Sequence, residues 1–128
     1  MKPSRLTAIE HVEIEAPLGI EPALRWFFGE VCGLEEITGT YPSGVQLLFR
    51  SARLELRIRC VDRPQVDSVN RRMTIAVSSL REAAERLDEQ GVEYDRVSGF
   101  TYTDRRISTL DPAGNRVELK QEWPEAPL

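Results

Sequence analysis

The same order of secondary structure can be read twice along this chain. Each copy begins with a strand, continues with an amphipathic helix and ends with further strands. Strand-like alternation occurs at residues 7–16, 44–50, 53–60, 72–78, 92–97, 105–110 and 116–122. Helices are predicted from Pro22 to Gly33 and from Ser79 to Gly91, because proline suits a first helical turn and glycine ends a helix. An internal repeat constrains the architecture more than any single motif does.

Short stretches of the two copies also match. The first helix ends in GLEE and the second in GVEY, while the last strands read LELR and VELK. We therefore predict an α+β fold with two βαβββ repeats, at 7–62 and 70–122, in one domain that spans 1–128. Each repeat would form a four-stranded sheet with its helix on one face. The two sheets are expected to pair around a cleft.

The alternation also assigns side chains to the face that the helix does not cover. The residues predicted for this face are His11, Glu13, Glu55, Arg57, Arg59, Arg72, Thr74, Arg106, Glu118 and Lys120. We expect the face to line the cleft. A carboxylate placed there, such as Glu118, must be paired, hydrated or bound to a metal.

One motif is more specific than the rest: the turn DPAGN at 111–115, which leads into a strand that carries Glu118. With IEHVEIEAP, RLELRIR and VSSLREAAERLDEQGVEY, it resembles the vicinal oxygen chelate superfamily, the group of glyoxalases, bleomycin-resistance proteins and extradiol dioxygenases. The resemblance covers about residues 8–122. The resemblance implies the two-repeat fold. It also implies a homodimer, because two-repeat members of this length often form homodimers.

The resemblance also implies a set of metal ligands. Metal-dependent members place one ligand on the first strand and one on the last strand of each repeat. In this chain these positions fall on His11, Glu55 and Glu118, and the fourth falls on Arg72. Arginine cannot take that role, because it keeps its proton.

The first functional hypothesis is a metal-dependent lyase or isomerase that acts on a substrate with vicinal oxygens. His11, Glu55 and Glu118 would hold Mn, Ni, Zn or Fe as a Lewis acid. Glu118 and His11 would be catalytic, and the substrate would be held by Arg72, Arg106 and Arg57. A ring-cleaving oxygenase is disfavoured, since its triad needs two histidines and the chain has one.

Two alternatives remain open. In the second hypothesis no metal is bound: Arg72 pairs with Glu55, Glu118 or both, and the cavity binds a drug or metabolite, as bleomycin-resistance proteins do. A general base, Glu118 or His11, could still act there. In the third hypothesis the domain is a non-catalytic partner module, since one fold hosts many functions.

Composition excludes some partners. The net charge of −4 gives no general attraction to nucleic acid or to an anionic membrane, and no apolar run reaches membrane-spanning length. The two cysteines, Cys32 and Cys60, make a disulfide framework unexpected, so we expect a reduced, cytoplasmic setting. The segments 38–44 and 98–104 are predicted to shape the mouth of a pocket for a small-molecule ligand.

Overall fold

The described part of the chain forms two four-stranded sheets, which we name sheet A and sheet B. The computed structural model describes residues 11–52, 54–66, 72–98 and 105–122. Sheet A has the order β1-β4-β3-β2 and consists of β1 (His11–Pro17), β2 (Glu35–Glu36), β3 (Leu47–Ser51) and β4 (Leu54–Val61). Sheet B has the order β5-β8-β7-β6 and consists of β5 (Arg72–Val77), β6 (Tyr94–Ser98), β7 (Arg105–Leu110) and β8 (Arg116–Gln121).

The two sheets have the same topology. In each, the first strand pairs in parallel with the last, and the remaining neighbours are antiparallel. The predicted α+β fold with two βαβββ repeats is therefore confirmed. The strand β2 was not predicted on its own, because two residues are too few to show an alternation.

The helices lie where the sequence predicts them, with one irregularity. A short helix α1 (Glu21–Arg25) has Pro22 in its first turn and continues as a π-helix, η1 (Trp26–Val31). The wider turn is marked by the backbone N–H of Cys32, which donates to the carbonyl of Phe27 at 3.0 Å. Periodicity alone does not distinguish this turn from a regular one.

The second helix, α2 (Leu80–Glu89), begins as predicted. The hydroxyl of Ser79 accepts a hydrogen bond from the backbone N–H of Glu82 at 3.1 Å. This bond satisfies one of the N–H groups that a first turn leaves open. No helix in the described residues is long and apolar enough to cross a membrane.

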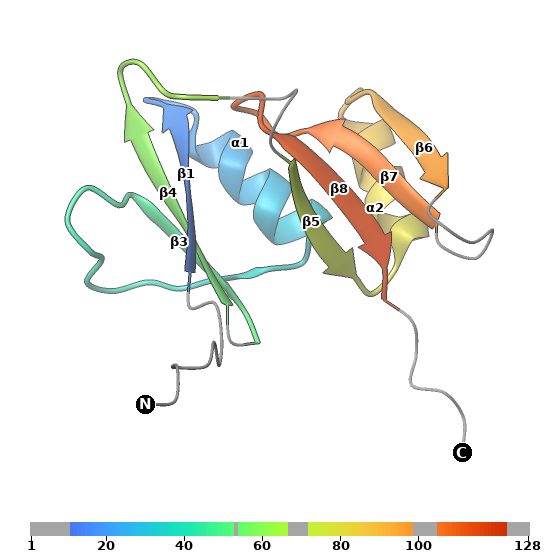
Figure 1. Cartoon of the computed structure of the whole chain (residues 1–128), viewed down its shortest axis with the longest axis horizontal. Helices are drawn as coiled ribbons and strands as arrows, with labels where there is room; N and C mark the ends of the chain where they lie inside the picture. Colours follow the sequence, from blue (N-terminus) through green and yellow to red (C-terminus); the bar gives the residue numbers. More distant parts are fainter. Residues whose placement is uncertain (1–10, 53, 67–71, 99–104, 123–128) are drawn as a thin grey trace, which may run out of the picture.

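One hydrophobic core joins both sheets and both helical segments. Its members include Phe27 and Phe28 from η1, Leu87 from α2, Ile58 from β4 and Leu119 from β8. Figure 1 shows α1 beside sheet A and α2 behind sheet B, and α2 contacts η1. Because each sheet turns its apolar face to this core, its charged face lies on the side away from the core.

Candidate functional site

The strand register places the predicted charged residues of repeat one on a single face of sheet A. His11 lies opposite Glu55, Glu13 opposite Arg57 and Glu15 opposite Arg59 across the parallel pair β1–β4. Residues in register on neighbouring strands point to the same side of a sheet. The assignment made from alternation is therefore correct for sheet A.

The same holds for sheet B. Glu118 lies in the middle of β8, with Thr74 of β5 opposite it on one side and Ser108 of β7 on the other. Arg72 lies opposite Arg116, and Arg106 lies opposite Lys120. We name this surface the charged face of sheet B, and it consists of Arg72, Thr74, Arg106, Ser108, Arg116, Glu118 and Lys120.

Glu118 is the buried centre of this face. Its residue surface is 7% exposed, and each of its carboxylate oxygens accepts a bond from a different arginine. Nη1 of Arg72 donates to Oε1 at 2.9 Å, and Nη1 of Arg106 donates to Oε2 at 3.1 Å. The metal-free hypothesis predicts that Arg72 pairs with Glu55, Glu118 or both, and in the structure it pairs with Glu118.

The glutamates of sheet A are also held by arginines. Glu55 accepts from Arg57 at 3.2 Å and from Arg50 at 3.4 Å, and Glu13 accepts from Arg59 at 3.2 Å. The hydrogen bond from Arg57 is the main reason that the pKa of Glu55 lies below its usual value. The hydrogen bond from Arg59 lowers the pKa of Glu13 in the same way.

The three proposed metal ligands do not meet in one copy of the chain. His11 and Glu55 are neighbours on sheet A, whereas Glu118 belongs to sheet B. Among the residues with a described position, no three His, Cys, Asp or Glu side chains form a group that could hold a metal ion. Guanidinium groups already bind the carboxylates of Glu55 and Glu118, so within one copy of the chain this donor set does not fit a divalent cation.

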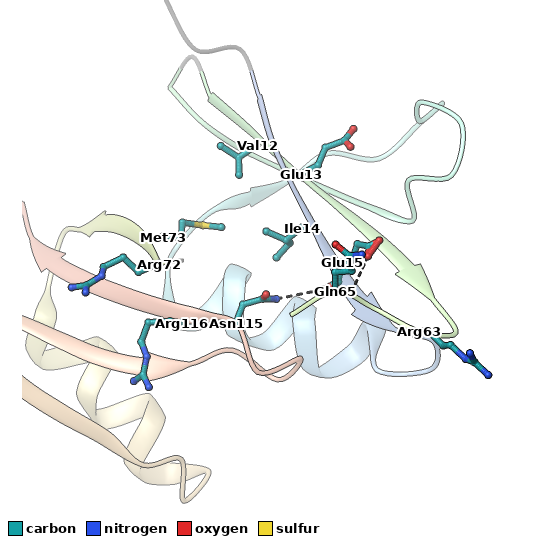
Figure 2. Close-up of a pocket in the computed structure, with 10 residues that line it drawn as sticks. All are labelled: Val12, Glu13, Ile14, Glu15, Arg63, Gln65, Arg72, Met73, Asn115 and Arg116. Carbon is teal, nitrogen blue, oxygen red and sulfur yellow. Dashed lines mark hydrogen bonds between the residues drawn. The ribbon is translucent and has the colours of Figure 1, made fainter. Parts of the chain in front are cut away.

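A cleft of about 880 Å³ lies between the edge strands β1 and β5. Its lining residues are Val12, Glu13, Ile14, Glu15, Arg63, Gln65, Arg72, Met73, Asn115 and Arg116. Figure 2 shows Val12 and Ile14 pointing toward Met73, while the guanidinium groups of Arg72 and Arg116 point away from them. The cleft therefore combines an apolar strip, formed by Val12, Ile14 and Met73, with charged and polar side chains around it.

These lining residues correct part of the prediction. Of the residues predicted to line the cleft, Glu13 and Arg72 do so, whereas His11, Glu55 and Glu118 do not. Val12 and Ile14, from the apolar side of β1, line it as well. The reason is that both sheets turn their apolar faces toward one shared core. Residues 38–44 do not line the cleft either, and residues 99–104 of the other predicted loop lie outside the described residues.

The turn in the DPAGN motif has a structural role. Asp111 is 4% exposed and accepts bonds from the backbone N–H groups of Ala113, at 3.0 Å, and Asn115, at 2.7 Å. Burial is the main reason that its pKa lies above the usual value. The side chain of Asn115 donates to the carbonyl of Glu15 at 3.4 Å, which links the turn to β1. The sequence alone does not predict that Asn115 contacts β1, because this contact depends on how the two repeats pack against each other.

Solved structures with the same arrangement identify the fold. A glyoxalase family protein from Bacillus anthracis is 25% identical and superposes with a TM-score of 0.76, over 95% of this chain and 100% of the other. This chain has the glyoxalase-like fold of the vicinal oxygen chelate superfamily. No protein-family model and no curated protein matches it.

Two further likenesses support the fold alone, because their identities are low. A lactoylglutathione lyase from Agrobacterium tumefaciens is 19% identical, with a TM-score of 0.65 over 92% of this chain and 96% of its own. A fosfomycin resistance protein from Listeria monocytogenes is 20% identical, with a TM-score of 0.72 over 94% of this chain and 98% of its own. The glyoxalase-like fold thus supports both an enzyme and a resistance protein.

Proposed function

We propose that this protein with a glyoxalase-like fold binds a small molecule on the charged face of sheet B without a bound metal. The observation that carries the proposal is the arrangement of Glu118 between Arg72 and Arg106. In this arrangement a guanidinium group stands at the fourth ligand position and neutralises the carboxylate that a metal would otherwise bind. A general-base role for Glu118 or His11 is compatible with it.

Electrostatics favours the metal-free form. A divalent cation at Glu118 would either lie beside two guanidinium groups or displace them from the carboxylate. Like charges about 4 Å apart repel by about 4 kcal/mol per pair of unit charges at the effective dielectric constant of a protein surface. That repulsion opposes the attraction between the cation and the carboxylate of Glu118.

The metal-dependent lyase or isomerase is the second candidate, and one observation favours it. His11 and Glu55 are in register on neighbouring strands, so an imidazole and a carboxylate share one face. A third donor for this pair would have to come from elsewhere, and in the metal-dependent members that the chain resembles it sits at the position of Glu118. Two copies of the chain could supply it.

We also propose that the protein is a homodimer. In the described part of the chain, β1 pairs only with β4 and β5 only with β8, so each sheet has an open edge beside the cleft. Val12, Ile14 and Met73 offer apolar contacts there. A second copy packed against this region would bury these apolar side chains.

The dimer can be tested by light scattering coupled to size exclusion. Wild type is expected at twice the chain mass, and Met73→Glu is expected at the monomer mass, because it places a charge in the apolar contact. Val97→Glu is the matched control, since Val97 is an exposed apolar residue on β6, the strand of sheet B farthest from β5 and the cleft. A monomeric wild type across the micromolar range would contradict the dimer.

The metal-free function is tested by two measurements on untagged protein. After incubation with Mn, Ni, Zn or Fe(II), elemental analysis should find well below one metal per chain. Thermal-shift screening of charged and neutral small molecules should find ligands whose effect is lost in Glu118→Gln. Stoichiometric metal that disappears in His11→Ala would favour the metal-dependent enzyme. If no small molecule binds to the protein with or without added metal, a non-catalytic partner module is favoured.

The reduced setting inferred for the chain fits its two thiols. Cys32 and Cys60 are both free and buried. We therefore propose that the protein is located in the cytoplasm.

A further inference from the structure

We infer that the charged face of sheet B binds its ligand through a carboxylate or phosphate group, and that Arg72 is the main contact for that group. This inference names the ligand class and rests on the proposed function. It follows from three features of the face: its charge, its supply of hydrogen-bond donors, and the placement of Arg72.

The two sheets differ in the charge of their exposed faces. On sheet A, the register places four carboxylates and three guanidinium groups on the charged face, which gives −1 without His11. These are Glu13, Glu15, Glu35, Glu55, Arg50, Arg57 and Arg59. The strands of sheet B carry two carboxylates and four cations on the corresponding face, which gives +2. These are Asp95, Glu118, Arg72, Arg106, Arg116 and Lys120.

The positive charge is concentrated at one edge of sheet B. Asp95 is on the edge strand β6, whereas Arg72 is on the opposite edge strand β5, beside Arg116 of β8. The only carboxylate on β5 and β8 that points to this face is Glu118. An anionic group is therefore attracted to the β5–β8 side of the face.

The hydrogen-bonding groups on that side are mostly donors. Guanidinium groups donate and cannot accept, and the hydroxyls of Thr74 and Ser108 flank Glu118. The Ser108 hydroxyl accepts a bond from Arg116 at 3.2 Å and has its own proton to donate. Glu118 is the strong acceptor of the group, and both of its oxygens already accept bonds from arginines. A ligand that complements this side must bring acceptors, which is what a carboxylate or phosphate does.

Arg72 is both held in place and accessible. Its side chain is 65% exposed, and one Nη1 bond to the buried Glu118 fixes its orientation. A guanidinium has five N–H donors in a planar fork that matches a carboxylate or phosphate. Figure 2 shows this guanidinium pointing away from the apolar side chains of Val12, Ile14 and Met73, so an anion bound to it would lie over sheet B.

The test compares acids with their neutral amides by isothermal titration and by amide chemical shifts of labelled protein. The probes are benzoate against benzamide, hexanoate against hexanamide, and inorganic phosphate. At least one anionic probe should bind. Its amide should bind at least about tenfold more weakly, since a charge-assisted hydrogen bond contributes roughly 1.5–3 kcal/mol. Raising the salt concentration should lower the affinity for the anionic probe.

Two variants of matched chemistry locate the site. Arg72→Gln should lower the affinity for the anionic probe about tenfold or more. Arg50→Gln should leave it unchanged, because Arg50 is a similarly exposed arginine that bonds to a glutamate on the other sheet. Shift changes on binding should centre on β5 and β8.

The outcomes separate this inference from the proposed function. If amides bind as well as acids, if only neutral compounds bind, or if Arg50→Gln weakens binding as much as Arg72→Gln does, the anion site is refuted while small-molecule binding stands. If none of the probes and no compound of the wider thermal-shift screen binds, both fail.

Discussion

Glu118 should be coupled more strongly to Arg106 than to Arg72, although the two contacts are almost equally short. The distances are 3.1 Å to Arg106 and 2.9 Å to Arg72. The exposures differ far more: the Arg106 side chain is 27% exposed and that of Arg72 is 65% exposed. Water screens the second pair more effectively, so geometry and energy should rank the two pairs in opposite orders.

The structure sets the expected magnitudes. An exposed ion pair such as Arg72–Glu118 typically contributes about 0.2–1 kcal/mol. A hydrogen bond to a charged group that is largely shielded from water contributes about 1.5–3 kcal/mol, and Arg106–Glu118 should lie toward the lower end of that range. The coupling energies should therefore differ by about 1 kcal/mol, which exceeds the usual error of a double-mutant cycle.

The assay is urea unfolding followed by far-ultraviolet circular dichroism. It needs wild type, the three single variants Glu118→Gln, Arg72→Gln and Arg106→Gln, and the two doubles that share Glu118→Gln. Glutamine keeps the shape of glutamate and removes its charge. A difference of about 1 kcal/mol in the free energy of unfolding corresponds to roughly 3–5 °C in Tm for a domain of this size.

Equal couplings, or a larger one for Arg72, would refute the reasoning. That result would mean that water does not reach Arg72 in solution, so the face of sheet B must be covered there. Repeating the cycle at two protein concentrations would then show whether a second copy covers it, because only an intermolecular contact makes stability depend on concentration.

Three other predictions concern the framework and its titration. Asp111→Ala should destabilise the fold by about 2 kcal/mol in the same urea assay, since it removes the acceptor for two backbone N–H groups, and Asp111→Asn should cost less because one oxygen remains. Neither thiol should react with a disulfide reagent at pH 8 until urea unfolds the chain, because burial raises the pKa of Cys60 to about 11 and that of Cys32 further; rapid labelling of native protein would contradict this. The pKa of Glu55 is lowered from its usual 4.5, so its stabilising effect is present above that pH and is lost as pH falls through the folded-state pKa. Glu55→Gln should flatten the acid limb of a Tm-against-pH profile, and an unchanged limb would show that its ion pairs are absent in solution.

The parts of the fold that depend on local periodicity could be predicted from the sequence. Alternation with a period of two placed His11 with Glu55 and Glu118 with Thr74 on the correct sheet faces, because side chains in register share a side. The Ser79 cap could also be predicted from the sequence, because its partner Glu82 is only three residues away in the chain.

The parts that depend on the packing of one repeat against the other could not be predicted in this way. Nothing local states whether two sheets meet through their charged or their apolar faces. Here the apolar faces share one core, so His11 and Glu118 are separated within a single copy, and Val12 and Met73 flank the cleft instead. The π-helix at Trp26–Val31 was missed as well, since its apolar residues fit a regular helix equally well.

The ion-pair network of Arg72, Glu118 and Arg106 is the feature that most constrains function. Arg72 and Arg106 pair with the two carboxylate oxygens of Glu118, so the carboxylate can remain buried in the sheet. Replacing such a network by apolar residues is often neutral or stabilising, so stability alone gives little reason for three charged side chains here. A binding role does give one, because Glu118 orients guanidinium donors that a ligand anion can reach. The acid–amide comparison in Arg72→Gln is therefore a test of why this part of the sheet is charged at all.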